Sequence, residues 1–425
     1  MSMNIIHRDV VIIGGGPAGL AAAVSAGKNG ADVLLIERDN ALGGILQQCI
    51  HPGFGLVRFH EELTGPEYYS RFTDMVCKMG IETFLNTTVL EMDAEAGRIL
   101  CISKEQGMIT VQAKSIVLAM SCRERTRAQI MVPGSRPSGI FTAGAAQRLI
   151  NRQNIMIGKK IVIVGSGDIG MIMARRFSLE GAEVAMVVEL MPYLAGLTRN
   201  RVQCLDDFGI PLKLAHTVTR IEGESRVTGV YVAPVDEERK PILDQEFYVP
   251  CDTVLFSVGL IPENELTRQA GIEICPKSNG VKVNQYMQSS APKVFACGNV
   301  VHVNDLVDNV SEESERAGEY AALFALGGLK EYDSAVRCLA RNNVRYICPQ
   351  TVVLPSQDDR VTLFFRVLKP DSDVTLELWN NGTLVQSQKT IRVNPGEINS
   401  MTVNVNDLSE GELTIIPVKE GENDE

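Results

Sequence analysis

The chain has 425 residues and a net charge of −11, from 41 basic and 52 acidic side chains. This acidity and an aromatic content of 5% argue against a nucleic-acid-binding protein, which needs a basic surface. The length predicts about two to three domains. The ten cysteines include no C-x-x-C pair, which is typical of the reducing cytosol rather than of a disulfide framework.

The first residues lack the apolar core of a secretory signal, and the most apolar long window, residues 10–26, is interrupted by glycines and a proline. We therefore expect a cytoplasmic protein without a transmembrane segment. The acidity either serves solubility or favours a basic protein partner.

Residues 9–37 have the pattern of a strand, a helix and a second strand. The apolar runs Val10–Ile13 and Val33–Ile36 are too short for helices and predict buried strands. Three glycines between them form a G-x-G-x-x-G pattern: Gly14, Gly16 and Gly19. The first allows a tight turn, the second lets the backbone approach a pyrophosphate, and the third lets helix and strand pack closely. Glu37 can accept hydrogen bonds from a ribose hydroxyl, so the stretch predicts a dinucleotide site rather than a plain glycine-rich turn.

Two more glycines, Gly43 and Gly44, open a loop that runs to Leu56 and can lie close to a flat ligand. A helix is expected over Pro66–Met79. Short alternating runs then predict a β-meander, followed by a separate apolar strand. The strands expected are Thr88–Asp93, Arg98–Ser103, Met108–Ala113 and Ser115–Met120.

A second strand–helix–strand pattern begins at Lys160. Its glycines repeat the same spacing: Gly165, Gly167 and Gly170. Glu189 closes the second strand, so the chain is expected to bind two dinucleotides unless the second site has decayed. A carboxylate here suits a free 2′-hydroxyl and repels a 2′-phosphate by about 1–4 kcal/mol at about 4 Å. No arginine pair follows in residues 189–198, so NAD is favoured over NADP.

Further strands are expected within Ile210–Glu222, over Thr253–Val258 and over Lys293–Asn299, which ends in Gly-Asn. A long helix is predicted over Asn309–Leu326, with Asn309 and Glu312 as a capping box. From Arg341 short strands take over and predict a small antiparallel β-sandwich, with a hairpin turn at residues 380–382. These strands are Asn343–Ile347, Arg360–Leu368, Val374–Trp379, Thr383–Val393, Ser400–Val405 and Glu412–Val418.

Residues 5–335 resemble the two-dinucleotide flavoprotein reductases, and most closely the thioredoxin-reductase-like group. The resemblance is carried by the motifs GGGPAGL, LGG, GSGDIG, SVGLIPEN and FACGN. It implies an α/β fold in which a Rossmann-like NAD(H)-binding domain, residues 125–258, is inserted in a Rossmann-like FAD-binding domain, residues 1–124 and 259–338. A C-terminal all-β module then spans residues 340–425.

The resemblance also implies which residues contact the two dinucleotides. Asn299 would touch the ribityl chain of FAD, and the helix end near Asn309 would face the pyrimidine edge of the flavin. The residues expected at FAD or NAD(H) are Gly14, Gly16, Pro17, Ala18, Gly19, Glu37, Arg38, Gly43, Gly44, Gln47, Gln48, Val89, Ser121, Gly165, Gly167, Asp168, Ile169, Gly170, Glu189, Gly259, Gly298, Asn299, Asn309 and Val310.

The chain departs from these reductases at the sites of disulfide chemistry. The segment Ile140–Ala146, which matches the redox C-x-x-C of thioredoxin reductases, has no cysteine, and Cys49 stands alone where lipoamide-type reductases carry C-x-x-x-x-C. The family's late Gly-Asp is Gly298-Asn299, and its A-T-G is Ala119–Ser121. We therefore expect the NADH–flavin half-reaction without the disulfide half, and no metal site or iron–sulfur centre.

Three segments look like a narrower group: GGILQQCIHPGFGL, ACGNVVHVNDLVDNVSEESERAG and the C-terminal β-module. These are the FAD-dependent oxidoreductases that accompany anaerobic glycerol-3-phosphate dehydrogenases in bacteria, related to opine and sarcosine oxidase alpha-type subunits. The resemblance implies an oligomeric NAD(P)H oxidoreductase that relays hydride or electrons between NAD(H) and a partner flavoprotein dehydrogenase or electron-transfer protein.

The loop after Gly44 supplies the candidate catalytic residues. Gln47 and Gln48 could hydrogen-bond the flavin ring. Cys49 could be a redox thiol, form a flavin adduct or simply pack, and His51 could donate a proton or be structural. Two other functions stay open. One is an NADH oxidase that uses Cys49, and the other is a non-catalytic nucleotide-binding subunit docked through its β-module.

Overall fold

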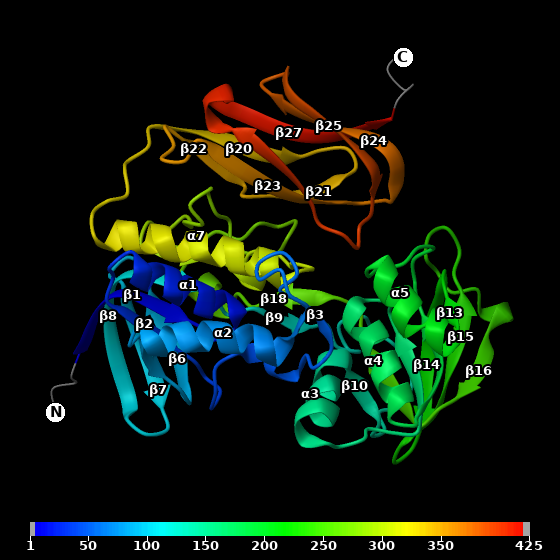
Figure 1. Cartoon of the computed structure of the whole chain (residues 1–425). Coiled ribbons are helices and arrows are strands. Elements are labelled where there is room, and N and C mark those ends of the chain that lie inside the picture. The colour runs from blue at the N-terminus through cyan, green and yellow to red at the C-terminus, as the bar shows by residue number, and fades with distance from the viewer. Residues whose placement is uncertain (1–4, 420–425) are drawn as a thin grey trace. The chain divides into compact units, whose positions relative to one another are not determined.

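The computed structural model of the chain describes residues 5–419 and divides into two compact units (Figure 1). Unit 1 comprises the residues up to 122, residues 262–394 and the residues from 398 on. Unit 2 comprises residues 123–261 and 395–397. Among the described residues, no helix is long and apolar enough to cross a membrane.

Unit 1 is built on a seven-stranded sheet in the order β5-β2-β1-β8-β7-β6, with β19 also pairing β8. The members of this sheet are β1 (Ile5–Ile13), β2 (Val33–Ile36), β5 (Glu82–Phe84), β6 (Thr87–Asp93), β7 (Arg98–Ser103), β8 (Gly107–Leu118) and β19 (Val294–Ala296). β1, β2 and β8 run parallel, and Val10, Val11 and Ile12 of β1 are fully buried, as expected of a central parallel strand.

The meander prediction is wrong at one point. Residues 108–118 form the single strand β8, not two strands interrupted at Lys114. Lys114 breaks the apolar pattern because its ammonium pairs with Asp9 on β1, 2.8 Å away. Both halves of β8 keep parallel pairing with β1, so the strand continues past this exposed lysine.

Three helices of unit 1 matter for the site: α1 (Pro17–Lys28), α2 (Gly65–Lys78) and α7 (Val307–Ala325). A Cβ added to Gly318 of α7 would lie 2.1 Å from the carbonyl oxygen of Ala22, so α7 packs closely on the alanine-rich α1. The capping box predicted for α7 is wrong, because the N-cap is the extended residue Leu306 and Asn309 lies inside the first turn. Shorter elements are β3 (Pro52–Phe54), β4 (Leu63–Thr64) and α6 (Glu265–Gln269).

The C-terminal β-module of unit 1 is a sandwich of a five-stranded sheet, β22-β20-β27-β24-β25, and a three-stranded sheet, β21-β23-β26. Its strands are β20 (Ser334–Ala340), β21 (Val344–Cys348), β22 (Thr351–Leu354), β23 (Arg360–Val367), β24 (Asp371–Asn380), β25 (Thr383–Val393), β26 (Asn399–Asn404) and β27 (Gly411–Lys419). The predicted hairpin is confirmed, since Asn381 and Gly382 both have positive φ between paired strands. The sequence analysis missed β20 and β22, and β20 pairs in parallel with β27, so the sandwich is not wholly antiparallel.

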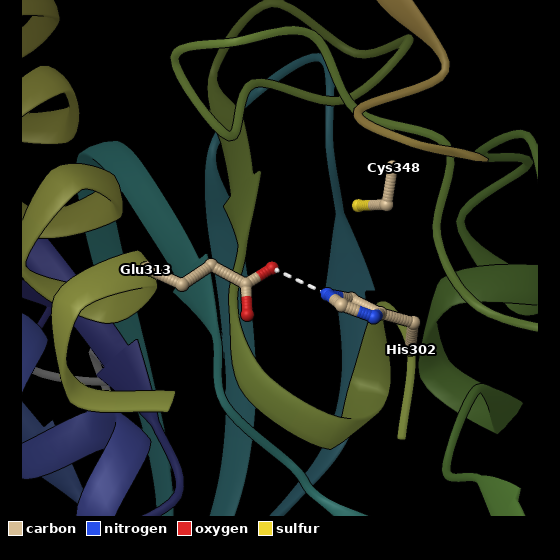
Figure 2. A group of neighbouring side chains, drawn as sticks. All are labelled: His302, Glu313 and Cys348. Carbon is tan, nitrogen blue, oxygen red and sulfur yellow. Dashed lines mark ion pairs between the residues drawn. The ribbon is translucent and has the colours of Figure 1, made fainter. Parts of the chain in front are cut away.

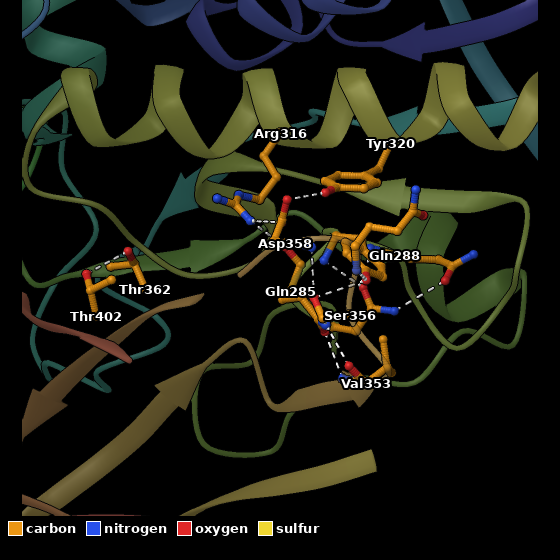
Figure 3. Close-up of polar contacts among 12 residues, drawn as sticks. Gln285, Gln288, Arg316, Tyr320, Val353, Ser356, Asp358, Thr362 and Thr402 are labelled. Atoms are coloured by element: carbon orange, nitrogen blue, oxygen red, sulfur yellow. Dashed lines mark hydrogen bonds and ion pairs between the residues drawn. The ribbon is translucent and has the colours of Figure 1, made fainter. Parts of the chain in front are cut away.

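Polar contacts join the β-module to the dinucleotide-binding part of unit 1 (Figure 3). The carboxylate of Asp358 accepts hydrogen bonds from Arg316 Nη1 at 2.7 Å and from the Tyr320 hydroxyl at 2.5 Å, both on α7. The side-chain amide of Gln285 exchanges two hydrogen bonds with the backbone of Val353, at 2.8 and 2.9 Å, as a neighbouring strand would. The two parts also share one hydrophobic core.

Unit 2 has a parallel sheet in the order β10-β17-β11-β12-β13 and an antiparallel sheet β14-β15-β16. The strands are β10 (Ile140–Thr142), β11 (Lys160–Val164), β12 (Glu183–Val188), β13 (Leu212–Lys213), β14 (His216–Gly223), β15 (Val227–Pro234), β16 (Phe247–Pro250) and β17 (Thr253–Phe256). The helices are α3 (Ala143–Gln153), α4 (Asp168–Leu179) and α5 (Thr198–Cys204). β9 (Cys122–Glu124) and β18 (Leu260–Pro262) pair where the chain enters and leaves unit 2.

Candidate dinucleotide sites

The first glycine motif lies in the turn between β1 and α1. Gly14 has φ +111°, and a Cβ there would lie 2.4 Å from the carbonyl oxygen of Ala119. A Cβ on Gly19 would lie 1.7 Å from the Gly14 carbonyl oxygen. Around Gly16, by contrast, the nearest neighbour of an added Cβ is 3.9 Å away. The turn therefore requires glycine at its first and last motif positions and leaves bare backbone at the middle one.

The first turn of α1 can receive an anion. Its N-cap is Gly16, and in the described structure no side chain caps the helix and no acid stands in its first turn. Pro17 begins the helix, at a position where a missing N–H costs no intrahelical hydrogen bond. A helix N-terminus carries about +0.5 charge and points its amides outward, so this end fits a pyrophosphate.

The two acids that close the strand pairs are held in the same way. Glu37 accepts the amide of Gly15 at 2.6 Å and that of Asp39 at 2.7 Å. Glu189 accepts the amide and hydroxyl of Ser166 at 2.8 and 2.7 Å, and the amide of Met191 at 2.9 Å. Both side chains are buried, yet a carboxylate has about four acceptor positions, so each can still accept from a ribose.

The second glycine motif is as tightly constrained as the first. Gly165 has φ +93°, and a Cβ there would lie 2.2 Å from the carbonyl oxygen of Ser257. A Cβ on Gly170 would lie 2.6 Å from Ser257 Cβ, and the Gly170 amide donates to Ser257 Oγ at 3.0 Å. Gly167 is the N-cap of α4, and Ile169 lies half-buried in its first turn.

Asp168, an acid in a phosphate-binding turn, has a structural explanation. Its Oδ1 accepts the backbone amide of Leu197 at 2.8 Å and the side-chain amide of Asn200 at 2.6 Å. The carboxylate thus fixes the loop that follows β12. It also stands in the first turn of α4, where a negative charge is favourable.

The Gly-Gly loop lies against the first glycine motif. The Gly43 amide, at φ +108°, donates to the Gly15 carbonyl at 2.8 Å, and a Cβ on Gly44 would lie 3.0 Å from Gly16 Cα. Gln47 donates its side-chain amide to the carbonyls of Leu42 and Ala41, just before the loop, at 2.8 and 3.2 Å. That amide nitrogen is therefore turned toward these carbonyls, whereas Gln48 is buried.

The two remaining catalytic candidates are partly exposed. Cys49, which follows the short 3₁₀ helix 44–48, has its thiol 3.3 Å from the Ile45 carbonyl. His51 has Nδ1 3.0 Å from the Pro52 carbonyl, and its ring centroid lies 5.0 Å from that of Phe54. Contacts of this kind, with residues of the same loop, hold both side chains in place.

Two further segments meet the first motif from the C-terminal half of unit 1. A Cβ on Gly298, at φ +70°, would lie 2.9 Å from Ala18 Cβ and 3.3 Å from Val310. Asn299 accepts the Asn304 amide at 2.9 Å, and its own side-chain amide lies 3.5 Å from Cys122 Sγ. The structure thus brings Ala18, Gly298 and Val310 together.

Other predicted contact residues stand on separate elements. Val89 pairs with Cys101 within the meander. Ser121, at φ +65°, accepts the Glu263 amide at 3.0 Å. Arg38 is exposed, and so is Gly259, which belongs to unit 2.

Sequence reasoning missed Asp308 in the first turn of α7. Its Oδ2 accepts the Val57 amide at 2.9 Å, and its buried Oδ1 has no hydrogen-bond partner among the described residues. Arg58 pairs with Glu315, so the loop after Cys49 is fastened to α7 at two points. An acid beside a predicted helix start is the signal that could have found Asp308.

A family model described as pyridine nucleotide-disulphide oxidoreductase matches residues 8–319. The chain belongs to this family. The match spans both glycine motifs, and their geometry fits FAD and a pyridine nucleotide. The oxidoreductase is therefore an FAD-dependent enzyme. The predictions of the broad flavoprotein reductase family, the fold class and the enzyme class are confirmed, and the narrower group stays a prediction.

Curated relatives of this oxidoreductase include hydrogen cyanide synthase subunit HcnB of Pseudomonas aeruginosa, 27% identical over 74% of this chain and 70% of the relative. The NADH oxidase of Methanocaldococcus jannaschii is 27% identical over 70% of this chain and 64% of its own length. One of the opine oxidase subunits of Agrobacterium tumefaciens is 24% identical, over 76% of this chain and 66% of the relative. Among solved structures, the thioredoxin reductase of T. acidophilum superposes with a TM-score of 0.60 at 23% identity, over 76% of this chain and 98% of that one.

Proposed function

We propose that this oxidoreductase relays electrons between NAD(H) and a partner redox protein, without a redox disulfide of its own. The observation that carries the proposal is the loop of residues 43–56. It lies on the FAD-type glycine motif, where lipoamide-type reductases hold two cysteines, but contains Cys49 alone. Electrons that leave the flavin are thus expected to go to another protein.

Different residues of the chain would hold the two cofactors. The bare backbone at Gly16 and the uncapped end of α1 would bind the FAD pyrophosphate, and Glu37 its ribose. The turn around Gly165 and the carboxylate of Glu189 would do the same for NAD(H). When bound, FAD supplies the chemistry that converts a nicotinamide hydride into electrons for an acceptor.

Glu189 supports NAD rather than NADP as the nucleotide. Its carboxylate is locked by three hydrogen bonds at the end of β12, so it cannot swing away from a 2′-phosphate without losing them. A repulsion of about 1–4 kcal/mol corresponds to a preference of roughly tenfold to several-hundredfold.

Two of the relatives named above support a partner protein, because both are described as subunits. The sequence resemblance narrows the partner to an anaerobic glycerol-3-phosphate dehydrogenase, with which the protein would exchange electrons. The chain would then be one member of an oligomeric assembly, docked through its β-module.

The test is an anaerobic titration of the purified protein with NADH and then NADPH, followed by flavin absorbance. We expect full reduction by NADH and a much weaker response to NADPH. Glu189→Gln, which keeps the size of the side chain, should reduce the preference for NADH over NADPH about tenfold or more. Glu180→Gln, an exposed acid of the same unit, should leave it unchanged.

The acceptor is tested next. Reduced protein should ignore thioredoxin-like disulfides and be reoxidised by a glycerol-3-phosphate dehydrogenase. Fast turnover with NADH and air alone, abolished by Cys49→Ser but not by Cys77→Ser, would replace the relay with an NADH oxidase. A flavin that NADH does not reduce would leave a nucleotide-binding subunit instead.

A further inference from the structure

Three side chains with metal-binding atoms meet inside unit 1, on residues that the proposed electron relay does not use. They come from three different elements (Figure 2). His302 follows the short helix 298–300, Glu313 lies on α7 and Cys348 ends β21 of the β-module. One nitrogen, one carboxylate oxygen and the sulfur all lie within 4.8 Å of one another.

The cluster is buried, and two of its atoms make no hydrogen bond within the part of the chain that the structure describes. The side chains of His302 and Glu313 are 0% and 5% exposed, and Cys348 is 1% exposed. His302 Nε2 and Glu313 Oε1 lie 3.3 Å apart, but within residues 5–419 neither makes a hydrogen bond of acceptable geometry. Buried polar atoms are nearly always hydrogen-bonded, so this pair indicates a missing occupant.

The other ends of the same side chains are already fixed. Glu313 Oε2 accepts the side-chain amide of Asn304 at 3.2 Å. His302 Nδ1 lies 3.4 Å from the hydroxyl of Tyr346. These contacts fix the two side chains so that Glu313 Oε1 and His302 Nε2 face each other (Figure 2), as outer hydrogen bonds orient metal ligands.

The spacing fits a tetrahedral metal ion. Zinc bonds of about 2.0–2.2 Å to nitrogen and oxygen place two ligand atoms roughly 3.3 Å apart at the tetrahedral angle. The observed separation of 3.3 Å matches this value. A zinc–sulfur bond of about 2.3 Å requires the sulfur roughly 3.6 Å from the other ligands, which is within a small side-chain adjustment.

The charges also balance. A thiolate and a carboxylate cancel the two charges of a divalent cation, and neutral imidazole adds none. The loaded site would therefore bury no net charge, whereas an unpaired buried charge is costly. Mixed sulfur, nitrogen and oxygen ligands in tetrahedral geometry favour zinc over magnesium or calcium.

We propose that His302 Nε2, Glu313 Oε1 and Cys348 Sγ bind one zinc-type divalent cation. The ion would connect β21 of the β-module directly to α7 and to the segment that follows Gly298. Since all three ligands are buried, its role would be structural, holding the module against the FAD-binding part of the same unit.

The test uses the full untagged chain, purified without chelators, and elemental mass spectrometry. We expect about one zinc per chain, or uptake of one equivalent of added Zn²⁺ by chelator-treated protein. Cys348→Ser and His302→Gln should reduce the bound zinc at least tenfold. Cys338→Ser, at a buried cysteine of the same module outside the cluster, should retain it. Flavin content checks that each variant is folded.

X-ray absorption at the zinc edge supplies a readout that needs no variant. One sulfur at about 2.3 Å and nitrogen or oxygen neighbours at about 2.0 Å are expected. A wild-type chain that holds no zinc and takes up none on titration would overturn the proposal. So would bound zinc without sulfur, or zinc retained at the wild-type level by both ligand variants.

Discussion

Replacing Asp358 should loosen the β-module from the rest of unit 1. The carboxylate accepts from the Tyr320 hydroxyl, on a side chain that is 3% exposed, and pairs with Arg316. A hydrogen bond to a charged group contributes about 1.5–3 kcal/mol. The arginine pair is partly exposed, at 36% and 28%, so it adds only about 0.2–1 kcal/mol. Asp358→Ala should therefore lower the free energy of unfolding of the module by about 2–4 kcal/mol.

The chain offers its own probe for the measurement. Trp379, its single tryptophan, lies on β24 of the module, so its fluorescence during urea unfolding reports the module alone. Tyr320→Phe removes only the hydroxyl and should cost about 1–2 kcal/mol. The double variant should lose less stability than the sum of the two single losses, because both substitutions remove the same hydrogen bond. Asp359→Ala, at the exposed neighbour, is the matched control.

The reasoning would be refuted if Asp358→Ala shifted the urea midpoint no more than Asp359→Ala does. Strict additivity with Tyr320→Phe would also contradict it, because the two side chains would then act independently. Flavin release can be followed in the same samples by absorbance. Release at the same urea concentration as the tryptophan transition is expected if the module and the FAD-binding part unfold as one unit.

Three more outcomes are expected. Gly19→Ala should yield protein without FAD, measured by absorbance after purification, because the new Cβ would lie 1.7 Å from a backbone oxygen. Hydrogen bonds from Lys114 and from the Asp32 amide lower the pKa of Asp9 in the folded protein. The stability that the Asp9 carboxylate contributes is therefore present above the unfolded pKa of about 3.9 and is lost as the pH falls through the folded pKa. Asp9→Asn should accordingly reduce the melting temperature at pH 7, with a smaller difference in acid. Burial raises the pKa of Cys101 to about 12, so alkylation at mildly alkaline pH should label exposed Cys77 and leave Cys101 unmodified, as peptide mapping would reveal.

The parts of the fold that depend on local sequence could be predicted. Val10–Ile13 and Val33–Ile36 are continuous apolar runs because parallel strands are buried on both faces. The hairpin at Asn381–Gly382 follows from the positive φ that this pair tolerates. The capping box at Asn309 failed because asparagine followed by glutamate also occurs inside acidic helices.

The rest depends on contacts between distant residues. The sequence pattern predicted that a strand ends at Lys114. In the structure the strand continues through Lys114, because its partner Asp9 lies on the neighbouring strand. The role of Asp168 could not be predicted, because its hydrogen-bond partners Leu197 and Asn200 lie in a loop that is distant in the sequence. His302 and Cys348 are far apart along the chain, so periodicity and motif spacing could not bring them together.

The shared anchoring of Glu37 and Glu189 has a consequence for how the nucleotides bind. A free glutamate side chain loses about 1.5–2 kcal/mol of rotamer entropy when it is fixed. Here one backbone amide of the glycine turn and one of the loop that follows the strand fix each carboxylate during folding. A ribose that binds therefore meets a preorganised acceptor, and no entropy is lost in fixing the glutamate side chain. This strengthens binding without adding a contact.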